Sequence, residues 1–295
     1  MLNILAVTHA WRFTHFVDRG EKTASPEGLS PAQRAWVTLT GVTVPRPENR
    51  RFPVDVGLRA AESGVGNVAT WTIEGAGRGT VLLLHGYGGS KSDNLDEARV
   101  FHDLEYTTVL VDFPGSGDSR GNVTTLGWQE AEVVRALAVE MDGPIVLFGK
   151  SMGAAAILRA VGGLGASADA LVLENPYDRL VTTVAHRFEA MGLPGQPGAA
   201  LLTFWGGALL GYNGFAMDPV HFAPAVRAPT LLLHGEHDPR LKLTEARTIE
   251  AALAGSAELV VFPGAGHAGL YAADPGLWRA SVSQFLAGVP SVAPE

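Results

Sequence analysis

The chain contains no cysteine. This absence excludes disulfide bonds, a thiol nucleophile and cysteine-based metal sites, although it does not fix the cellular compartment. Positive charge is also scarce, since 22 Lys and Arg stand against 30 Asp and Glu and the formal net charge is −8. Without a cluster of Lys or Arg, this balance argues against a nucleic-acid partner.

Long uncharged stretches are rare as well. The only one runs from residue 190 to residue 217, and Pro194, Pro197 and many glycines interrupt it, which disfavours a membrane span. The first seven residues are mostly apolar but are interrupted at Asn3. No basic region precedes them and no small-residue cleavage site follows, which disfavours a secretory signal. We therefore expect a cytoplasmic protein without a transmembrane span.

What the chain does have is an ordinary globular composition, with 46% hydrophobic and 18% charged residues over 295 positions. From residue 80 onward, short apolar runs typical of buried strands alternate with segments of helical spacing. The strand-like runs are Val81–Leu84, Val109–Val111, Ile145–Phe148, Leu171–Leu173, Thr230–Leu233 and Leu259–Phe262. The helical segments cover about 93–104, 125–141, 152–158, 244–253 and 275–286. Continuously apolar strands between helices predict an α/β fold with a mostly parallel sheet covered on both faces.

Two segments depart from this alternation. Residues 1–50 lack a strong periodic pattern, and we expect an N-terminal extension that approaches the domain in extended form and packs on the core. Two short strands are expected next, at 52–58 and 69–73. Residues 51–295 then form a single domain, into which a helical lid of about 179–221 is inserted between strands.

The central motif of the sequence is Gly149-Lys150-Ser151-Met152-Gly153, which lies between an apolar strand and a run of helix formers. A Gly-x-Ser-x-Gly in a strand-turn-helix context is typical of a nucleophile elbow, where the serine is held in a strained conformation. Gly149 and Gly153 provide the small residues that this turn needs, because strand and helix approach each other closely there. Ser151 is therefore the predicted nucleophile.

Gly149-Lys150-Ser151 also matches the end of a phosphate-binding P-loop, but the rest of that motif is absent. A P-loop requires a glycine five residues before the Gly-Lys pair, and Pro144 stands there. The intervening residues are those of a buried strand and lack the glycines that wrap phosphates. We therefore reject nucleotide binding.

A serine nucleophile needs a base and a carboxylate that orients the base. His267 follows the last predicted strand in a glycine-rich loop, and Asp238 follows the strand before it. Their order along the chain, Ser151, Asp238, His267, is the order of this elbow type. The alternatives that stay open are Glu236, Glu174 and Asp178 for the acid and His234 for the base.

The turn after the first strong strand, His85-Gly86-Tyr87-Gly88-Gly89-Ser90, is the expected oxyanion loop. The backbone N–H groups of Tyr87 and Met152 are the predicted donors to the oxyanion. We expect His85 itself to be a structural, hydrogen-bonded residue. The run from Asp112 to Gly121 is expected to form an ordered turn at the same rim.

Together these motifs show that the chain resembles the α/β-hydrolase superfamily from about Phe52 to the C-terminus. Within it, the chain is similar to the serine-aminopeptidase-like and monoacylglycerol-lipase-like esterase group. One departure is Lys150, where that group more often carries an aromatic residue, histidine or an acid. This cation could favour acidic substrates or could point along the surface, and we favour the second interpretation.

The lid is rich in large apolar residues, which either form an apolar acyl pocket or pack the lid onto the sheet. A contact between this lid and a lipid surface also stays open. The apolar residues are Phe188, Met191, Leu201, Leu202, Phe204, Trp205, Leu209, Leu210, Tyr212, Phe215 and Met217.

The resulting hypothesis is a serine hydrolase of carboxylic esters with short- to medium-chain acyl groups, of the carboxylesterase or lipase class (EC 3.1.1). It would act through a Ser-His-Asp triad and an acyl-enzyme, without metal or organic cofactor, on a small-molecule ester, as a monomer or homodimer. Two alternatives stay open. The first is an aminopeptidase or amidase, which would need acids to bind the substrate amine, and Glu174 and Asp178 are the hints for such acids. The second is a non-catalytic binding protein.

Overall fold

The computed structural model describes residues 2–267 and 269–289. Its described residues form one eight-stranded sheet in the order β1-β2-β4-β3-β5-β6-β7-β8. The strands are β1 (Ala61–Val65), β2 (Val68–Ile73), β3 (Thr80–Leu84), β4 (Thr107–Val111), β5 (Ile145–Lys150), β6 (Ala170–Glu174), β7 (Thr230–Gly235) and β8 (Ala257–Phe262). Strands β3 to β8 pair in parallel, whereas β1 and β2 are antiparallel. The predicted mostly parallel sheet is confirmed.

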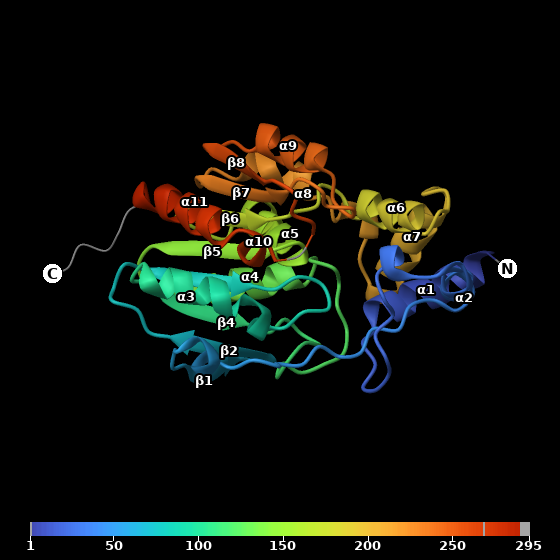
Figure 1. Cartoon of the computed structure of the whole chain (residues 1–295), viewed down its shortest axis with the longest axis horizontal. Coiled ribbons are helices and arrows are strands. Elements are labelled where there is room, and N and C mark those ends of the chain that lie inside the picture. Colours follow the sequence, from blue (N-terminus) through green and yellow to red (C-terminus); the bar gives the residue numbers. More distant parts are fainter. Residues whose placement is uncertain (1, 268, 290–295) are drawn as a thin grey trace.

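Helices cover both faces of this sheet (Figure 1). On one face, α3, α10 and α11 pack against the sheet, and on the other face α4, α5, α8 and α9 do so. The bounds of these helices are α3 (Leu95–Asp103), α4 (Glu130–Val139), α5 (Met152–Leu158), α8 (Pro219–Phe222), α9 (Leu243–Ala252), α10 (Leu270–Ala273) and α11 (Pro275–Ala287). A π-helical turn, Arg159–Gly163, continues α5. The predicted helices are thus present, although α4 begins later than its spacing suggests.

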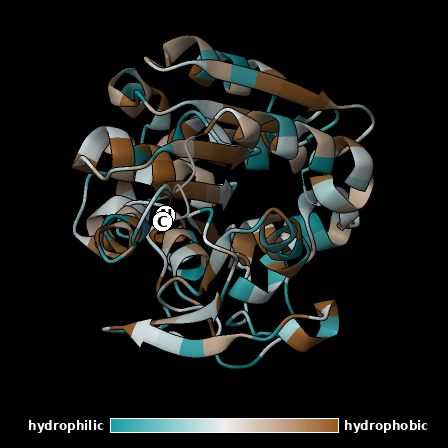
Figure 2. Cartoon of the chain, turned by 90° about the vertical axis from the view of Figure 1, so that its left-hand side faces the viewer, coloured by the Kyte–Doolittle hydropathy of each residue, from teal (hydrophilic) through white to brown (hydrophobic). Residues whose placement is uncertain are grey.

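The inner strands are apolar on both sides because both sides are buried. In β3, Val81 and Leu83 belong to the core on one face, and Leu82 and Leu84 belong to the core on the other. All four side chains are fully buried. Figure 2 shows these inner strands as predominantly hydrophobic. The continuous apolar pattern therefore has the cause that the sequence suggested.

The prediction of a strand at 52–58 is wrong. Residues Pro53–Val56 form a 3₁₀ helix, with Pro53 in its first turn, where a missing N–H is tolerated. The first strand of the sheet is instead β1, which the sequence did not indicate. All five of its residues are exposed at the sheet edge, so it lacks an apolar pattern.

The N-terminal segment contains two helices, α1 (Leu2–Thr14) and α2 (Pro31–Thr40), which its weak periodicity did not indicate. Ser30 caps α2 in a reciprocal capping box with Gln33, a local signal that the sequence does contain. α1 packs against helix α7 (Gly198–Leu210), which lies almost 200 residues away along the chain (Figure 1). The segment also reaches the core domain, because Phe16 donates a backbone hydrogen bond to the Asn122 carbonyl at 2.7 Å.

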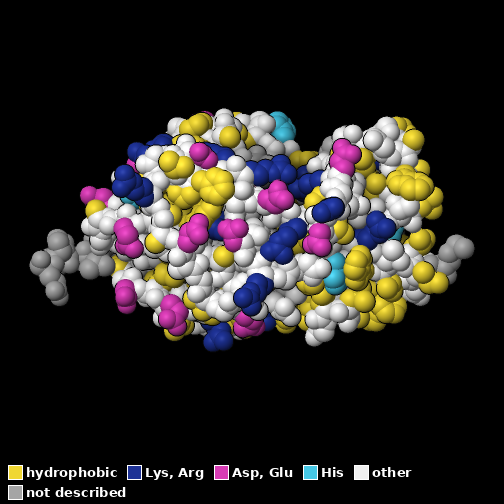
Figure 3. Space-filling view, turned by 90° about the horizontal axis from the view of Figure 1, so that it is seen from below, with side chains coloured by type: hydrophobic (Ala, Val, Ile, Leu, Met, Phe, Trp, Pro, Cys, Tyr) yellow, Lys and Arg dark blue, Asp and Glu magenta, His cyan; other side chains and the backbone are white. Residues whose placement is uncertain are grey.

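The segment between β6 and β7 carries helices α6 (Leu180–Ala190) and α7 and the short helix α8. α6, α7, α1 and α2 form one group at the end of the molecule that is on the right in Figure 1. Many hydrophobic side chains lie on the outer surface of this end (Figure 3). None of the helices in the described residues combines the length and hydropathy that crossing a membrane requires.

Candidate active site

Ser151 occupies a sharp turn between β5 and α5. Its backbone has φ 49° and ψ −108°, a strained conformation for a residue with a side chain. A Cβ on Gly149 would lie 2.6 Å from the Gly153 carbonyl carbon, and one on Gly153 would lie 2.5 Å from the Leu84 oxygen. Both positions therefore need glycine, for the reason the motif suggested. The turn has the geometry of a nucleophile elbow.

Asp238 and His267 come together at the ends of β7 and β8. Asp238 Oδ2 lies 2.6 Å from His267 Nδ1, and the Asp238 side chain is fully buried. Its Oδ1 accepts hydrogen bonds from the backbone N–H groups of Arg240, at 2.8 Å, and Leu241, at 3.0 Å. Burial alone would raise the pKa of this carboxyl, but the His267 hydrogen bond and charge and the two amides outweigh it and hold the pKa below its ordinary value. Asp238 is therefore an ionised carboxylate that fixes the imidazole.

A residue that the sequence did not single out links the serine loop to the histidine loop. Ser151 N–H donates to the Glu174 carbonyl at 2.8 Å, and the next residue, Asn175, donates its side-chain amide to the His267 carbonyl at 2.8 Å. Asn175 Oδ1 also accepts from Gly235 N–H, and its backbone has a positive φ of 46°. The position of Asn175 directly after β6 was the only feature of the sequence that could have indicated this role. Among the described residues no hydrogen bond joins Ser151 Oγ to His267.

The alternative acids and base are engaged elsewhere. Glu236 accepts from Gly264 N–H at 3.0 Å, and Asp178 is paired with Arg179 at 2.7 Å. The Nε2 atom of His234 lies 3.0 Å from the Leu241 carbonyl oxygen. Glu174, the remaining rival, is described with Lys150 below. Of the candidate acids, Asp238 is the one that is hydrogen-bonded to His267.

The glycine-rich loop after β3 lies against the serine. A Cβ on Gly86 would be 3.5 Å from Ser151 Cβ, which places Tyr87, the next residue, close to Ser151. The Met152 N–H is the first of α5 and has no acceptor within the helix. His85 is fully buried, its Nε2 accepts from Phe113 N–H at 3.1 Å, and burial lowers its pKa. It is a structural residue, as the sequence suggested.

The run from Asp112 to Gly121 forms the predicted ordered turn. Asp112 accepts hydrogen bonds from Lys91 Nζ at 2.5 Å, from Asn49 at 3.0 Å and from the Asp118 backbone at 2.9 Å. Lys91 is itself buried and lies over the Trp71 ring. This carboxylate is therefore used to hold the turn and the N-terminal segment in place.

The expectation that Lys150 points along the surface is wrong. Its side chain is only 17% exposed, and its Nζ lies 2.7 Å from Glu97 and 3.0 Å from the Asp93 carbonyl. Burial would lower the pKa of this ammonium, but the charges of Glu97 and Glu174 outweigh it and raise the pKa. The cation is thus held by interior acids on the α3 side of the sheet.

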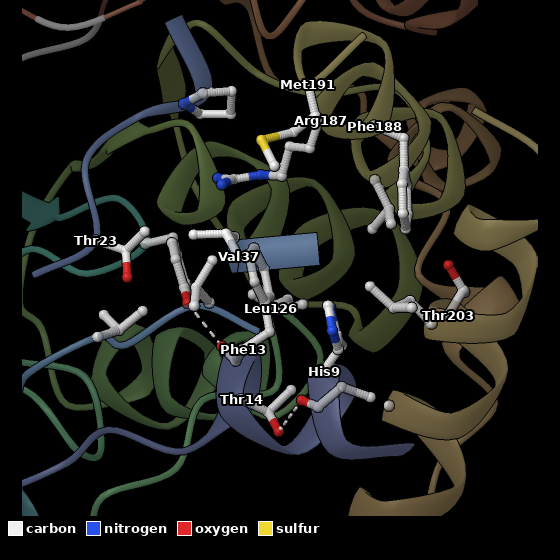
Figure 4. Close-up of a pocket in the computed structure, with 18 of the residues that line it drawn as sticks. His9, Phe13, Thr14, Thr23, Val37, Leu126, Arg187, Phe188, Met191 and Thr203 are labelled. Atoms are coloured by element: carbon white, nitrogen blue, oxygen red, sulfur yellow. Dashed lines mark hydrogen bonds between the residues drawn. The ribbon is translucent and has the colours of Figure 1, made fainter. Parts of the chain in front are cut away.

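A cavity of about 250 Å³ lies beside the loop that carries Tyr87 (Figure 4). It lies between the N-terminal segment, which carries α1 and α2, and the insertion between β6 and β7, which carries α6 and α7. Its wall includes Tyr87 of the oxyanion loop, residues of α1 and α2, and residues of α6 and α7. Ser151 is not part of that wall. Tyr87, which is part of it, directly follows Gly86, the glycine that packs against Ser151. The described residues that line it include no Asp or Glu.

The apolar residues of the insertion serve both roles that the sequence left open. Phe188, Met191, Leu202 and Tyr212 line the cavity. Met217 is buried in a cluster that attaches the insertion to the sheet domain, and Phe188, Leu202 and Tyr212 also pack against this cluster. The lining from α1 and α2 was missed, because residues 1–50 gave no strong periodicity.

The described residues contain no cluster of three or more His, Asp or Glu side chains placed to hold a metal ion.

The model of a family described as the alpha/beta hydrolase family matches residues 81–278. An uncharacterized protein of Bacillus subtilis (strain 168), YqkD, is 25% identical over 215 residues, covering 70% of this chain and 70% of that protein. An uncharacterized Mycobacterium tuberculosis protein, Rv2307c, is 29% identical over 195 residues, covering 63% of this chain and 62% of that protein.

Solved structures share the fold. The esterase Pf2001 of Pyrococcus furiosus superposes with a TM-score of 0.69 at 20% identity, over 83% of this chain and 97% of that chain. A putative lipase of Acinetobacter baumannii AYE superposes with a TM-score of 0.57 at 21% identity, over 79% of this chain and 92% of that chain.

Proposed function

Because the chain belongs to the alpha/beta hydrolase family, we propose that it hydrolyses carboxylic esters through Ser151, His267 and Asp238. The observation that carries this proposal is the 2.6 Å contact between Asp238 and His267, at the sheet edge that also bears the strained Ser151. An ionised acid holding an imidazole next to an elbow serine is the arrangement that activates a hydroxyl nucleophile. The esterase and lipase structures with the same fold agree with this chemistry.

The proposed reaction has two steps. Ser151 Oγ attacks the ester carbonyl carbon while His267 Nε2 takes the hydroxyl proton, and the Tyr87 and Met152 N–H groups stabilise the oxyanion. The bond to the leaving alcohol then breaks, and the alcohol takes the proton from His267. Water attacks the acyl-enzyme and gives a proton to His267, which returns it to Ser151 as the acid leaves. Asp238 keeps the imidazole in the tautomer that both steps need.

The cavity favours an ester over an aminopeptidase substrate. A free amine would need a carboxylate partner, and the described lining offers none. Glu174 and Asp178, the two acids that the sequence offered for this role, are 2% and 4% exposed and pair with other groups. Apolar side chains from α1, α6 and α7 instead suit a short- to medium-chain acyl group.

Replacing the nucleophile tests the proposal. We expect Ser151→Ala to lower kcat/KM for p-nitrophenyl butyrate by about four orders of magnitude or more, because Ser151 Oγ is the atom that attacks the ester carbonyl. A fluorophosphonate probe should label the wild-type protein at Ser151 and should not label the variant. Ser256→Ala, at an exposed serine far from the centre, is the matched control and should keep full activity. Undiminished turnover by Ser151→Ala would refute the assignment, and an unlabelled, inactive wild type would favour a non-catalytic binding protein.

The outer surface of the α1, α2 and α7 group supports a second element of the proposal, a contact with a lipid surface. Seven of the twelve large hydrophobic side chains that are exposed in the described residues lie on these three helices. They are Leu2, Ile4, Trp11, Trp36, Leu39, Phe204 and Leu209, with exposures between 41% and 72%. The only charged side chains on these helices are Arg12 and Arg34, although the whole chain is acidic. Apolar helices with tryptophan and positive charge are typical of interfacial binding to anionic lipid.

A further inference from the structure

The cavity beside the proposed catalytic centre contains two buried polar atoms without a partner. They are Nε2 of His9, from α1, and Oγ1 of Thr203, from α7, and both residues line the cavity. Thr203 is only 3% exposed. Figure 4 shows both side chains pointing into the pocket, each from its own helix. The two helices pack against each other, and Figure 4 shows the two side chains in the same part of the pocket.

The other hydroxyl groups along this wall have hydrogen-bond partners within the protein. Thr14 Oγ1 donates to the Ala10 carbonyl at 2.8 Å, as helical threonines often do. The hydroxyl of Tyr87 donates to the Phe13 carbonyl at 2.7 Å, and that of Tyr212 donates to the Thr125 carbonyl at 2.8 Å. His9 and Thr203 are therefore exceptions on a wall whose hydroxyl groups are otherwise paired. A buried polar atom without a partner destabilises a fold by about 1–3 kcal/mol, so an unused pair calls for an explanation.

The two groups are suited to a neutral ligand group. Burial and the charge of Arg12 lower the pKa of His9, and a hydrogen bond to the Thr38 backbone only partly opposes this. A neutral imidazole has one nitrogen that accepts and one that donates, and a threonine hydroxyl can do both. A hydroxyl on the ligand can donate to one of these groups and accept from the other. A methyl group in the same place would leave both unpaired.

We propose that this end of the cavity is a subsite for a hydroxyl group on the acyl chain of the substrate, bound by His9 and Thr203. The inference rests on the proposed ester hydrolysis and narrows its substrate class to esters of hydroxylated, otherwise apolar acids. Selectivity of this kind can be large, because a site built to hydrogen-bond a hydroxyl rejects the analogue that lacks it.

The position of the hydroxyl along the chain follows from α1. Phe13 stacks on Tyr87 of the oxyanion loop, with ring centroids 4.8 Å apart, and so marks the end of the cavity near Ser151. His9 lies four residues earlier on the same helix, which is about 6 Å further along the helix axis. The hydroxyl should therefore be distal to the ester, near the end of a medium-length chain.

The test compares matched p-nitrophenyl esters of hexanoic, 6-hydroxyhexanoic, octanoic and 8-hydroxyoctanoic acid. For wild-type protein, we expect one hydroxylated ester to have a higher kcat/KM than its plain counterpart. The variant Thr203→Val has the same shape but no hydroxyl, and it should reduce this preference about fivefold to tenfold through loss of one hydrogen bond. Its kcat/KM for the plain esters should rise, because valine leaves no unpaired hydroxyl beside their terminal methyl group.

A control variant and a stability measurement separate binding from a structural role. Thr183→Val on α6 removes a hydroxyl that bonds to the Arg179 carbonyl and does not line the cavity, so it should leave the preference intact. If Thr203 only held a structural water, Thr203→Val would lower Tm and leave the ratio between the paired esters unchanged. That result, or equal turnover of hydroxylated and plain esters by the wild type, would overturn the subsite.

A binding experiment distinguishes failure of the subsite from failure of the proposed reaction. In Ser151→Ala, calorimetric titration with 8-hydroxyoctanoic acid and with octanoic acid measures occupancy without turnover. We expect tighter binding of the hydroxy acid and loss of that difference in Ser151→Ala/Thr203→Val. A protein that hydrolyses no ester but shows this difference would keep the subsite and lose the reaction. Equal affinity for the two acids would refute the subsite.

Discussion

At the scale of single residues, the main surprise is the side chain that precedes Ser151. Lys150 lies at the end of β5, yet it points away from solvent into a buried group with Glu97 and Glu174. Glu174 is 2% exposed and accepts from the Trp278 indole N–H at 3.2 Å. Burial raises the pKa of Glu174 from 4.5 to about 7, although Lys150 opposes this shift. The interior behind Ser151 therefore holds a carboxyl that titrates near neutrality.

This carboxyl makes the stability of the protein depend on pH. Because the pKa of Glu174 is higher in the folded state than its value of 4.5 without burial, the folded state binds more protons between pH 4.5 and about 7. Its contribution to stability is therefore present at low pH and is lost as pH rises through that window, by roughly 3 kcal/mol at most. We predict that Glu174→Gln, which keeps an acceptor for Trp278, raises Tm relative to wild type at pH 8 and not at pH 5.

Thermal unfolding followed by circular dichroism at several pH values measures this difference. The matched control is Glu258→Gln on β8, whose side chain is exposed. It should shift Tm equally at both pH values. A Glu174→Gln variant that is less stable than wild type at pH 8 would mean that the ionised carboxylate is used to hold Lys150.

At the scale of elements, the helical insertion is attached to the sheet domain through a buried group of acids. Asp178, just before α6, and Glu245, on α9, are 4% and 5% exposed, and each has one carboxyl oxygen without a partner. His186 of α6 lies 3.2 Å from Glu245, and Arg179 pairs with Asp178. Burial and the charge of Asp178 raise the pKa of Glu245 to about 8, so one proton shared between the two carboxyls satisfies both unpaired oxygens.

This shared proton predicts how the attachment of α6 responds to pH. The folded-state pKa of Glu245 is raised, so its stabilising contribution is lost as pH rises from 4.5 toward about 8. We predict that Glu245→Gln, which can still donate to Asp178, reduces the loss of Tm between pH 6 and pH 9. Hydrogen exchange of α6 should slow in the variant at pH 9 relative to wild type.

The control for that experiment is Glu250→Gln on the same helix. It lies outside the buried group and should reproduce the wild-type pH profile. A Glu245→Gln profile as steep as that of the wild type would show that the proton is not shared between these carboxyls.

At the scale of the whole molecule, the N-terminal segment and the insertion pack together as one unit. α1 packs on α7, and the cavity that both of them line ends at Tyr87 of the sheet domain. The family model covers residues 81–278 and thus leaves α1 and α2 outside the match. Half of the residues that line the cavity, including His9, therefore lie outside the family match.

The same unit should mediate contact with lipid. We predict that Trp36→Ser/Leu39→Ser lowers the fraction of protein that sediments with phosphatidylglycerol-containing vesicles by about tenfold, because two exposed apolar side chains are lost from the surface of α2. Turnover of a water-soluble short-chain ester should be unchanged, since neither residue lines the cavity.

Val139→Ser on α4 removes an apolar side chain that is 74% exposed and lies outside the α1, α2 and α7 group, and it should sediment like wild type. Replacing phosphatidylglycerol by phosphatidylcholine should weaken binding, because Arg12 and Arg34 would lose their anionic partners. Wild-type protein that stays in the supernatant with both vesicle types would exclude the lipid contact.

Much of this protein can be predicted from its sequence, because the determining interactions are local. Continuous apolar runs predict a buried parallel sheet, and Gly149 and Gly153 predict a close approach of strand and helix. The contact between Asp238 and His267 follows from the rule that parallel strands end at one edge of a sheet. These inferences depend on chain neighbours and on periodicity, and both can be read directly from the amino acids.

Tertiary structure alone decided what depends on contacts between distant segments. Lys150 turns inward because Glu97, on α3, and Glu174, on β6, surround it, and no local pattern around residue 150 reveals those acids. The cavity needs α1 to lie against α7, and neither helix has a strong amphipathic pattern that would indicate its partner. The lack of a protein partner for His9 Nε2 and Thr203 Oγ1 likewise arises only once these two helices are packed together, because a polar atom is unpaired only with respect to its surroundings.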